Sequence, residues 1–344
     1  MRIKPGQNLG TLRRQCRRAL ICLMGLASIL IANTASTFAQ GNDAKWPDRP
    51  VRFIVPFPAG SASDIVARII ARKLGTQFGQ QFVIDNRPGA SGDIGTEAVA
   101  RAAPDGYTIG LATSSTHVVA ANLNPKLSYD PIADFAPVSM IGTSPYVLAI
   151  YPGVPAQSVT ELIALAKAKP RTFNYASVGP ASLAHVAGAL FSDLAGVELT
   201  EVPYRSSNQA ILDVTEGRIE MQFGTLGPTL GQIRDRKLRA LAITGAKRIE
   251  SLPDVPTLQE AGLAGYEVVL WMAVVMPAAS PPAIVARLNH AMRDALVATD
   301  VVVALKAQGV ESDPSTPDAV RERIHAEITK WRNLAPSADL KVEP

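Results

Sequence analysis

The segment VPFPAGSASD, residues 55–64, joins the end of an apolar run to the beginning of a helical pattern. The run at 51–56 is bordered by prolines and rich in β-branched residues, which predicts a strand. From 63 to 74 apolar residues recur at helical spacing, which predicts a helix that Gly75 ends. The turn between them consists of small residues and contains no Lys, Arg, His or Cys. This succession of strand, turn and helix is the repeating unit of an α/β fold.

The alternation of strand and helix continues beyond this segment. Residues 81–85 predict a second strand, 86–92 a glycine-rich loop, 93–103 a helix and 107–112 a third strand. Strands that alternate with helices form a parallel sheet whose faces the helices cover. We therefore expect the first part of the chain to form an α/β layer structure.

The middle of the chain begins a second set of such elements. Strands are predicted at 146–151, 173–177, 199–204, 219–223 and 241–244, and helices at 158–169 and 182–194. The long apolar run 268–276 suits a strand that crosses back toward the first set. Helices are then predicted at 281–296 and 317–334.

We therefore predict two similar α/β domains, the second inserted into the first. Domain I is discontinuous and covers 40–144 and 268–344, and domain II covers 145–267. A chain of this length usually divides into two domains, because single hydrophobic cores stop growing at about 250–300 residues.

The first 39 residues have the layout of a secretory signal peptide. Four arginines within 13–18 precede an apolar run at 19–32, and Ala39 ends a small-residue cleavage pattern. The apolar run is shorter than the roughly 20 residues of a membrane span, which disfavours an anchor. We expect cleavage near Ala39 and secretion into the periplasm, by either the Sec or the Tat route.

Removal of residues 1–39 changes the charge balance. The segment contains six of the 34 basic residues and none of the 30 acidic ones, so 28 basic and 30 acidic residues remain. The precursor's basic character is therefore no argument for nucleic-acid or anionic-membrane binding. Cys16 and Cys22 are removed as well, so we expect a secreted protein without disulfides, stabilised by its core alone.

Two turns at corresponding places in the two halves match each other. The first reads Pro58-Ala59-Gly60-Ser61 and the second Gly179-Pro180-Ala181-Ser182, and each precedes a predicted helix. The first amides of a helix have no internal partner, and the helix dipole adds partial positive charge there. Small residues allow a ligand to approach the backbone, so the pair predicts an anion site without basic side chains.

Ordinary turn chemistry is the alternative for each turn alone. Ser61-x-x-Asp64 is also the pattern of a capping box, and Ser182 is also a typical N-cap. The repetition in both halves favours a site for a ligand with two carboxylates, or for one carboxylate held from both sides. The role of Asp64, as a cap or as a ligand contact, stays open at this point.

A series of motifs along the chain points to one family. In order they are Trp46-Pro47-x-x-Pro50, Pro56-Phe57-x-x-Gly60-x-x-x-Asp64, Asn86-Arg87-Pro88-Gly89-Ala90, Gly92-x-Ile94-Gly95, Ala103-Pro104-Asp105-Gly106-Tyr107-Thr108, Pro203-Tyr204, Leu241-Ala242-Ile243-Thr244 and Leu252-Pro253-x-Val255-Pro256-Thr257-x-x-Glu260-Ala261-Gly262. This set resembles the Bug-type extracytoplasmic solute receptors of tripartite tricarboxylate transporters. The resemblance spans essentially the whole chain after residue 39.

The resemblance implies a type II periplasmic binding protein fold, in which two α/β domains joined by two crossing strands close on a small carboxylate. It implies that the loops 58–64 and 179–185 hold the ligand carboxylate, partly through ordered water. The implied partner is a two-subunit membrane permease, and we expect a monomer with no cofactor. Ser61 departs from the family, since many relatives have glycine there, so the ligand's identity does not follow.

We expect the ligand to contact residues from both halves of the chain. The candidates are Phe57, Pro58, Ala59, Gly60, Ser61, Ser63, Asp64, Ser114, Ser115, Ser177, Gly179, Pro180, Ala181, Ser182, His185 and Tyr204. For His185 a packed helix position is an equal alternative. Arg205 is interpreted as a surface charge.

Other functions receive less support. The loop Gly89-x-x-Gly92-x-x-Gly95 lacks the Lys-Ser/Thr of a P-loop, so nucleotide binding is disfavoured. The histidines after residue 39 have no metal-ligand spacing, so no metal is expected. A secreted hydrolase with Ser61 or Ser182 as nucleophile and His185 as base is the alternative, but no G-x-S-x-G occurs. A periplasmic sensor would use the same binding chemistry with a different partner.

Overall fold

The computed structural model describes residues 46–180 and 182–334. The predicted signal peptide, its cleavage point at Ala39 and the candidate site residue Ala181 lie outside the described residues. Contacts divide the chain into Met1–Trp46 and Pro47–Pro344, and the following concerns the second unit.

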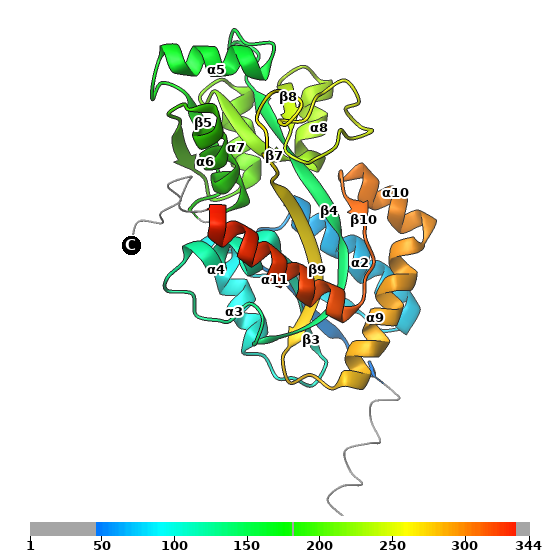
Figure 1. The fold of residues 1–344 in the computed structure, drawn as a ribbon. Helices are drawn as coiled ribbons and strands as arrows, with labels where there is room; N and C mark the ends of the chain where they lie inside the picture. Colours follow the sequence, from blue (N-terminus) through cyan, green and yellow to red (C-terminus); the bar gives the residue numbers. More distant parts are fainter. Residues whose placement is uncertain (1–45, 181, 335–344) are drawn as a thin grey trace, which may run out of the picture. The chain divides into compact units, whose positions relative to one another are not determined.

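A parallel three-stranded layer forms the first part of this unit. The strand β1 (Val51–Val55) lies between β2 (Phe82–Asn86) and β3 (Thr108–Thr113), and both pairings are parallel. The helices α2 (Ala62–Phe78) and α3 (Asp93–Ala100) connect these strands (Figure 1). The predicted alternation of strand and helix is therefore confirmed here.

The helix α2 is longer than its sequence pattern predicts. It continues through Gly75, and the chain leaves it at Gly79, whose φ of 66° is left-handed. The Gly79 N–H donates to the Gly75 carbonyl at 3.0 Å, which is typical of a glycine C-cap. The prediction that Gly75 ends the helix is wrong, because the last turn still contributes the half-buried Phe78, whose ring centroid lies 5.8 Å from that of Phe82 on β2.

A second parallel layer repeats the arrangement. The strand β5 (Asn174–Ser177) lies between β6 (Thr200–Pro203) and β7 (Met221–Thr225). The helices of this part are α5 (Val159–Ala168), α6 (Leu183–Ala195), α7 (Ser207–Thr215) and α8 (Leu226–Arg234). The predicted capping box of α5 is confirmed, because Ser158 Oγ accepts from the Glu161 N–H at 3.2 Å.

Two long strands connect the layers. The strand β4 (Phe135–Ile150) pairs antiparallel with β9 (Val269–Pro277) along its first part, and with β7 and β8 (Arg239–Ile243) along its second. The strand β9 also pairs with β3. Within the described residues these pairings make one sheet of ten strands, in the order β2-β1-β3-β9-β4-β7-β5-β6 with β8 and β10 (Glu311–Ser312) beside β4.

The crossing strand predicted at 268–276 is confirmed as β9, whereas the strand predicted at 146–151 is only the end of β4. The part of β4 before Tyr146 contains Pro137, Gly142 and Pro145, and its register with β9 shifts between Pro137 and Ser139 and between Met140 and Gly142. These residues interrupt the alternation of buried and exposed side chains by which a strand is recognised in a sequence. In the structure, bulges accommodate them within the strand.

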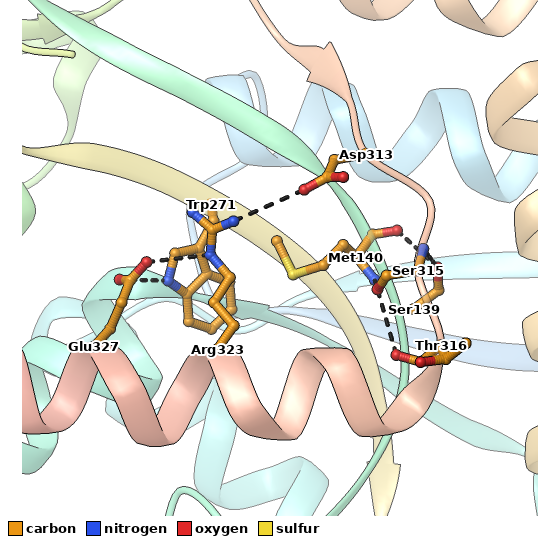
Figure 2. A network of polar contacts seen from close by, with 8 residues as sticks. All are labelled: Ser139, Met140, Trp271, Asp313, Ser315, Thr316, Arg323 and Glu327. Atoms are coloured by element: carbon orange, nitrogen blue, oxygen red, sulfur yellow. Dashed lines mark hydrogen bonds and ion pairs between the residues drawn. The ribbon is translucent and has the colours of Figure 1, made fainter. Parts of the chain in front are cut away.

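The C-terminal helices complete the fold. They are α9 (Pro282–Val297), α10 (Thr299–Ala307) and α11 (Pro317–Leu334), and α11 packs on β4 (Figure 1). Figure 2 shows the polar contact that attaches α11 to β9: Trp271 Nε1 donates to Glu327 Oε2 at 2.8 Å. Within α11, Arg323 Nε donates to Glu327 Oε1 at 3.1 Å. Burial raises the pKa of the Glu327 carboxyl. The strand β9 is therefore tied to α11 from its buried face.

Short elements follow β2 and β3. They are a 3₁₀ turn η2 (Ala90–Gly92), a π-helical turn η3 (Ser115–Val119) and the helix α4 (Ala120–Leu123). Among the described residues every helix is too short or too polar to cross a lipid bilayer. The predicted domain boundaries near residues 145 and 268 stay a prediction.

Candidate functional site

A cavity of about 440 Å³ lies at the carboxyl ends of the parallel strands. Segments that follow β1, β2 and β3 line it together with segments that follow β5, β6 and β7. In open α/β sheets this edge is where ligands bind. Eight of the expected ligand-binding residues line the cavity: Phe57, Pro58, Ser61, Ser63, Ser115, Ser177, Ser182 and Tyr204.

Other expected residues are not among those that line it. They are Ala59, Gly60, Asp64, Ser114, Gly179, Pro180 and His185. Most of them make hydrogen bonds within or beside the two turns. Ala181 lies outside the described residues.

The first turn leaves two amides toward the cavity. Ser61 is the N-cap of α2, and its Oγ accepts from the Asp64 N–H at 3.3 Å. The Gly60 N–H and the Ser61 N–H are also engaged, by Asp64 Oδ2 at 2.8 Å and by the Pro58 carbonyl at 3.2 Å. Within the described residues the N–H groups of Ala62 and Ser63 have no acceptor, and both residues line the cavity. These amides carry the positive end of the α2 dipole.

Asp64 is committed to the turn itself. Its carboxylate accepts from the Gly60 N–H, from Arg68 Nε at 2.9 Å and from Asn86 Nδ2 at 2.9 Å, and only 2% of the residue is exposed. Burial raises the pKa of this carboxyl, but the three donors outweigh burial and hold the pKa below its ordinary value. Asp64 therefore braces the loop between β1 and α2 rather than facing the cavity.

The second turn is built in a similar way. Ser182 Oγ accepts from the His185 N–H at 3.2 Å, as the N-cap of α6. The Leu183 N–H donates to Ser115 Oγ at 3.3 Å, and the Ser182 N–H donates to the Gly179 carbonyl at 3.2 Å. Of the first turn of α6, the Ala184 N–H is left without an acceptor in the described part of the chain. Ala184 lines the cavity, so the predicted pairing of two amide-bearing turns is present.

A polar chain supports the second turn from behind. The Gly179 N–H donates to Ser177 Oγ at 2.9 Å, and Ser177 Oγ donates to Glu201 Oε1 at 2.5 Å. His185 Nδ1 lies 2.8 Å from Glu201 Oε2. Burial raises the pKa of Glu201, but the contacts with His185 and Ser177 outweigh burial and lower it overall. His185 thus has the packed role that was one of its two interpretations.

The geometry gives no support to the hydrolase alternative. Ser182 Oγ meets the backbone N–H of His185, and the imidazole Nδ1 points to Glu201 instead. Ser61 Oγ is engaged as the N-cap of α2, with no histidine among its described contacts. A nucleophile and its base must lie within hydrogen-bond reach of each other.

The sequence interpretation missed a bridge across the cavity. Ser91, in the loop after β2, donates from its Oγ to the Pro180 carbonyl at 2.6 Å. Ala90 and Ser91 both have positive φ, 46° and 54°, so this loop is held in an unusual backbone conformation. The glycine-rich sequence of the loop was the available signal, but it was interpreted only as a family motif and as a disfavoured phosphate loop.

The segment after β6 forms another wall. The Tyr204 ring lines the cavity while its hydroxyl donates to Asp213 Oδ2 at 2.8 Å. Burial, together with this contact, raises the pKa of Tyr204 to about 12. Arg205 lines the cavity too, and among the described lining residues it alone carries a formal charge. The interpretation of Arg205 as only a surface charge was therefore incomplete, and the absence of lining acids suits an anionic ligand.

The segment after β3 contributes less than predicted. Ser115 lines the cavity, but Ser114 does not, and its Oγ is buried without a partner in the described residues. Thr113 and Thr116 bond to each other. His117 is fully buried, and burial lowers its pKa to about 3, so its ring is neutral.

The structure adds lining residues that periodicity did not single out. Tyr146 and Leu270 come from the long strands β4 and β9, and Gln222 and Thr225 come from β7. In a sequence these are ordinary strand residues. They become lining residues only because β4 and β9 pass beneath the cavity.

The fold and the cavity define a class of protein: two α/β layers joined by crossing strands around a cleft, as in periplasmic binding proteins. The family described as "Tripartite tricarboxylate transporter family receptor" matches residues 66–340. BugT of Bordetella pertussis (strain Tohama I) is 37% identical over 322 residues, which cover 93% of this chain and 98% of BugT. The chain belongs to this receptor family, and the resemblance inferred from its motifs is confirmed.

Solved structures agree with this assignment. Rpa4515 of R. palustris with adipate is 36% identical with a TM-score of 0.83, and the match covers 86% of this chain and 98% of that one. MatC (Rpa3494) from Rhodopseudomonas palustris with bound malate is 32% identical with a TM-score of 0.80, covering 84% of this chain and 99% of that one. The predicted type II periplasmic binding protein fold is confirmed by these neighbours.

Proposed function

We propose that the protein is a periplasmic receptor that captures a small carboxylate and delivers it to a two-subunit transporter permease. The ligand class comprises di- and tricarboxylates, acidic amino acids and aromatic acids. The observation that carries the proposal is that the amides of Ala62, Ser63 and Ala184 have no acceptor within the described residues. They lie at two helix N-termini beside one cavity whose described lining has no acidic residue. Such amides bind a carboxylate without a basic side chain.

Relatives support the ligand chemistry. Rpa4515 and MatC, which share this fold, are described with adipate and with malate, both dicarboxylates. The binding cycle has no catalytic step. Ligand binding favours the closed arrangement of domain I (40–144 and 268–344) and domain II (145–267), because the ligand touches both sides only when they are closed. The closed monomer is then the form that the permease recognises.

Thermal unfolding of the protein from residue 40 onward tests the proposal. The panel contains mono-, di- and tricarboxylates, aliphatic and aromatic, with the amide of each acid as control. At a hundredfold excess over Kd, a ligand adds about 2.7 kcal/mol to the free energy of unfolding, which is a shift of several degrees. We expect a shift with at least one acid and none with its amide.

A folded protein whose unfolding temperature changes with no carboxylate would contradict the proposal. A shift of equal size with an acid and its amide would contradict the assignment of the anion site. Repetition with sugars and amines would then identify the class that is bound.

A further inference from the structure

A side-chain amide near the beginning of β7 faces the cavity. Gln222 lines the cavity although only 2% of the residue is exposed. Its Nε2 donates to Thr229 Oγ1 on α8 at 3.3 Å. Within the described residues its Oε1 has no hydrogen-bond donor. This oxygen is not among the enclosed polar atoms that lack a partner, so it is open to the cavity, where a bound ligand can donate to it in place of water.

The surroundings hold the carboxamide in place. Thr229 is fully buried and fixes the Nε2 side of the amide. At Gly224 an added Cβ would lie 2.8 Å from both Gln222 Nε2 and Thr229 Oγ1. Glycine at this position therefore leaves the space that the amide occupies. A side chain that is positioned by two neighbours, with one acceptor left over, is pre-organised for a ligand.

The chemistry of the leftover atom restricts the ligand. A carbonyl oxygen accepts and does not donate, so it repels a carboxylate and binds a hydroxyl or an ammonium group. The carboxylate has a place elsewhere, at the amides that begin α2 and α6. Phe223 and Leu270 add apolar surface to the lining, which suits the carbon skeleton of the ligand.

We propose that Gln222 is a specificity-determining residue, whose Oε1 accepts a hydrogen bond from a hydroxyl or amino substituent of the bound acid. The inference rests on the proposed function and deepens it. The substrate class is then a hydroxy- or amino-substituted carboxylic acid. An acid of the same skeleton without the substituent binds more weakly, because it displaces water from Oε1 without replacing the hydrogen bond.

The experiment uses matched pairs of acids and titration calorimetry on the protein from residue 40 onward. The pairs are succinate with malate, adipate with 2-aminoadipate, and benzoate with 4-hydroxybenzoate. The variant Gln222→Leu keeps the approximate size of the side chain and removes its acceptor. Gln259→Leu is the control, because Gln259 is exposed and does not line the cavity.

In the pair that the protein binds, we expect the substituted acid to bind about tenfold more tightly than its parent, or better. Gln222→Leu should bring this ratio close to one, mainly by weakening the substituted acid. Gln259→Leu should keep the wild-type ratio. Thr229→Val, which releases the amide but keeps Gln222, should reduce the ratio, and it serves as the test should Gln222→Leu not fold.

Two results would overturn the inference alone: a wild-type protein that binds parent and substituted acid equally, or a Gln222→Leu variant that folds and keeps the wild-type ratio. A folded wild-type protein that binds none of the carboxylates would instead remove the proposed function, and this inference with it. The first two outcomes leave carboxylate binding intact, so the two failures are distinguishable.

Discussion

At the scale of single residues, the site is built from side chains that shape the backbone rather than touch the ligand. Asp64 is the clearest example, because it lies in the first turn of α2 and still uses both carboxylate oxygens on the protein. A carboxylate beside an anion site would otherwise repel the ligand. Its three donors neutralise that effect and fix the loop whose last amides face the cavity.

Replacement of Asp64 should lower stability in a pH-dependent way. The folded-state pKa of Asp64 lies below its ordinary value of 3.8. Its ionised carboxylate therefore adds to the free energy of unfolding above pH 3.8, and this contribution is lost as the pH falls through the folded-state pKa. We expect Asp64→Asn to lower the free energy of unfolding by about 1–3 kcal/mol at pH 7, because it weakens a buried hydrogen-bonded group. Denaturant unfolding at pH 7 and at several values below 4 measures both effects.

The matched control for this prediction is Asp193→Asn, since Asp193 is an exposed carboxylate on α6. It should leave stability nearly unchanged at each pH. A loss for Asp64→Asn that is the same at pH 3 as at pH 7 would show that the carboxylate's charge is not what holds the turn.

The site residues that the sequence pattern did not reveal are mostly those whose role depends on elements distant in the sequence. Ser61, Ser158 and Ser182 are visible as helix caps, because a cap and its amide lie three residues apart. Gln222 and Arg205 have no such local signature. Whether a strand glutamine is packed or faces a cavity depends on the elements that surround it.

At the scale of elements, the close approach of α3 to neighbouring strands explains why residue 95 is glycine, which the sequence motif alone does not. A Cβ on Gly95, in α3, would lie 2.7 Å from the Arg87 carbonyl and from Pro56 Cα. The helix α3 therefore lies directly against the ends of β1 and β2. Gly89-x-x-Gly92-x-x-Gly95 is a packing and turn motif in this protein, and no nucleotide is needed to account for it.

We expect Gly95→Ala to destabilise the protein by about 1–3 kcal/mol, because the added methyl group meets backbone atoms that cannot move aside. Gly231→Ala is the control, since nothing lies within 4 Å of a Cβ on this glycine in α8. This variant should be neutral or should raise the free energy of unfolding by about 0.4–1 kcal/mol, because alanine lowers the conformational entropy of the unfolded chain. Urea unfolding curves of both variants measure the difference, and equal stabilities would contradict the close packing of α3.

Elements with regular patterns were predictable and interrupted ones were not. The helix α5 and the strand β1 agree with their sequence patterns to within a residue, since each has one buried face and clear end signals. The first half of β4 was missed, because Pro137 and Pro145 read as loop residues and are accommodated by irregular pairing. The helix α7 was missed as well, because it is short and its N-cap, Ser206, lies only three residues after the end of β6.

At the scale of the whole described molecule, two direct hydrogen bonds join the segments on opposite sides of the cavity. They are Ser91 Oγ to the Pro180 carbonyl and the Leu183 N–H to Ser115 Oγ. Both can form without a ligand. In the binding cycle that we propose, contacts of this kind raise the population of the closed arrangement, and the apparent affinity for the ligand scales with that population.

Ser91→Ala should therefore weaken binding of every ligand by the same factor. The loss of one hydrogen bond corresponds to about 0.5–1.5 kcal/mol, or roughly two- to tenfold in Kd. The measurement is the Kd of two different bound acids, with Ser251→Ala, an exposed serine away from the cavity, as control. A change of ligand preference in Ser91→Ala would show instead that Ser91 contacts the ligand, and an unchanged Kd would exclude a role in closure.

The amino-acid sequence by itself determined the alternation of strands and helices, the two small-residue turns and the serine caps, because each is specified by neighbours within a few residues. Its motifs also determined the family. Only the tertiary structure decided that Asp64 serves the turn, that Ser91 reaches Pro180, and that Gln222 keeps a free acceptor toward the cavity. The physical reason is that these roles depend on how separate segments are brought together. Asp64 is joined to Asn86, 22 residues away, Ser91 is joined to Pro180, 89 residues away, and Gln222 meets a cavity that several elements form together.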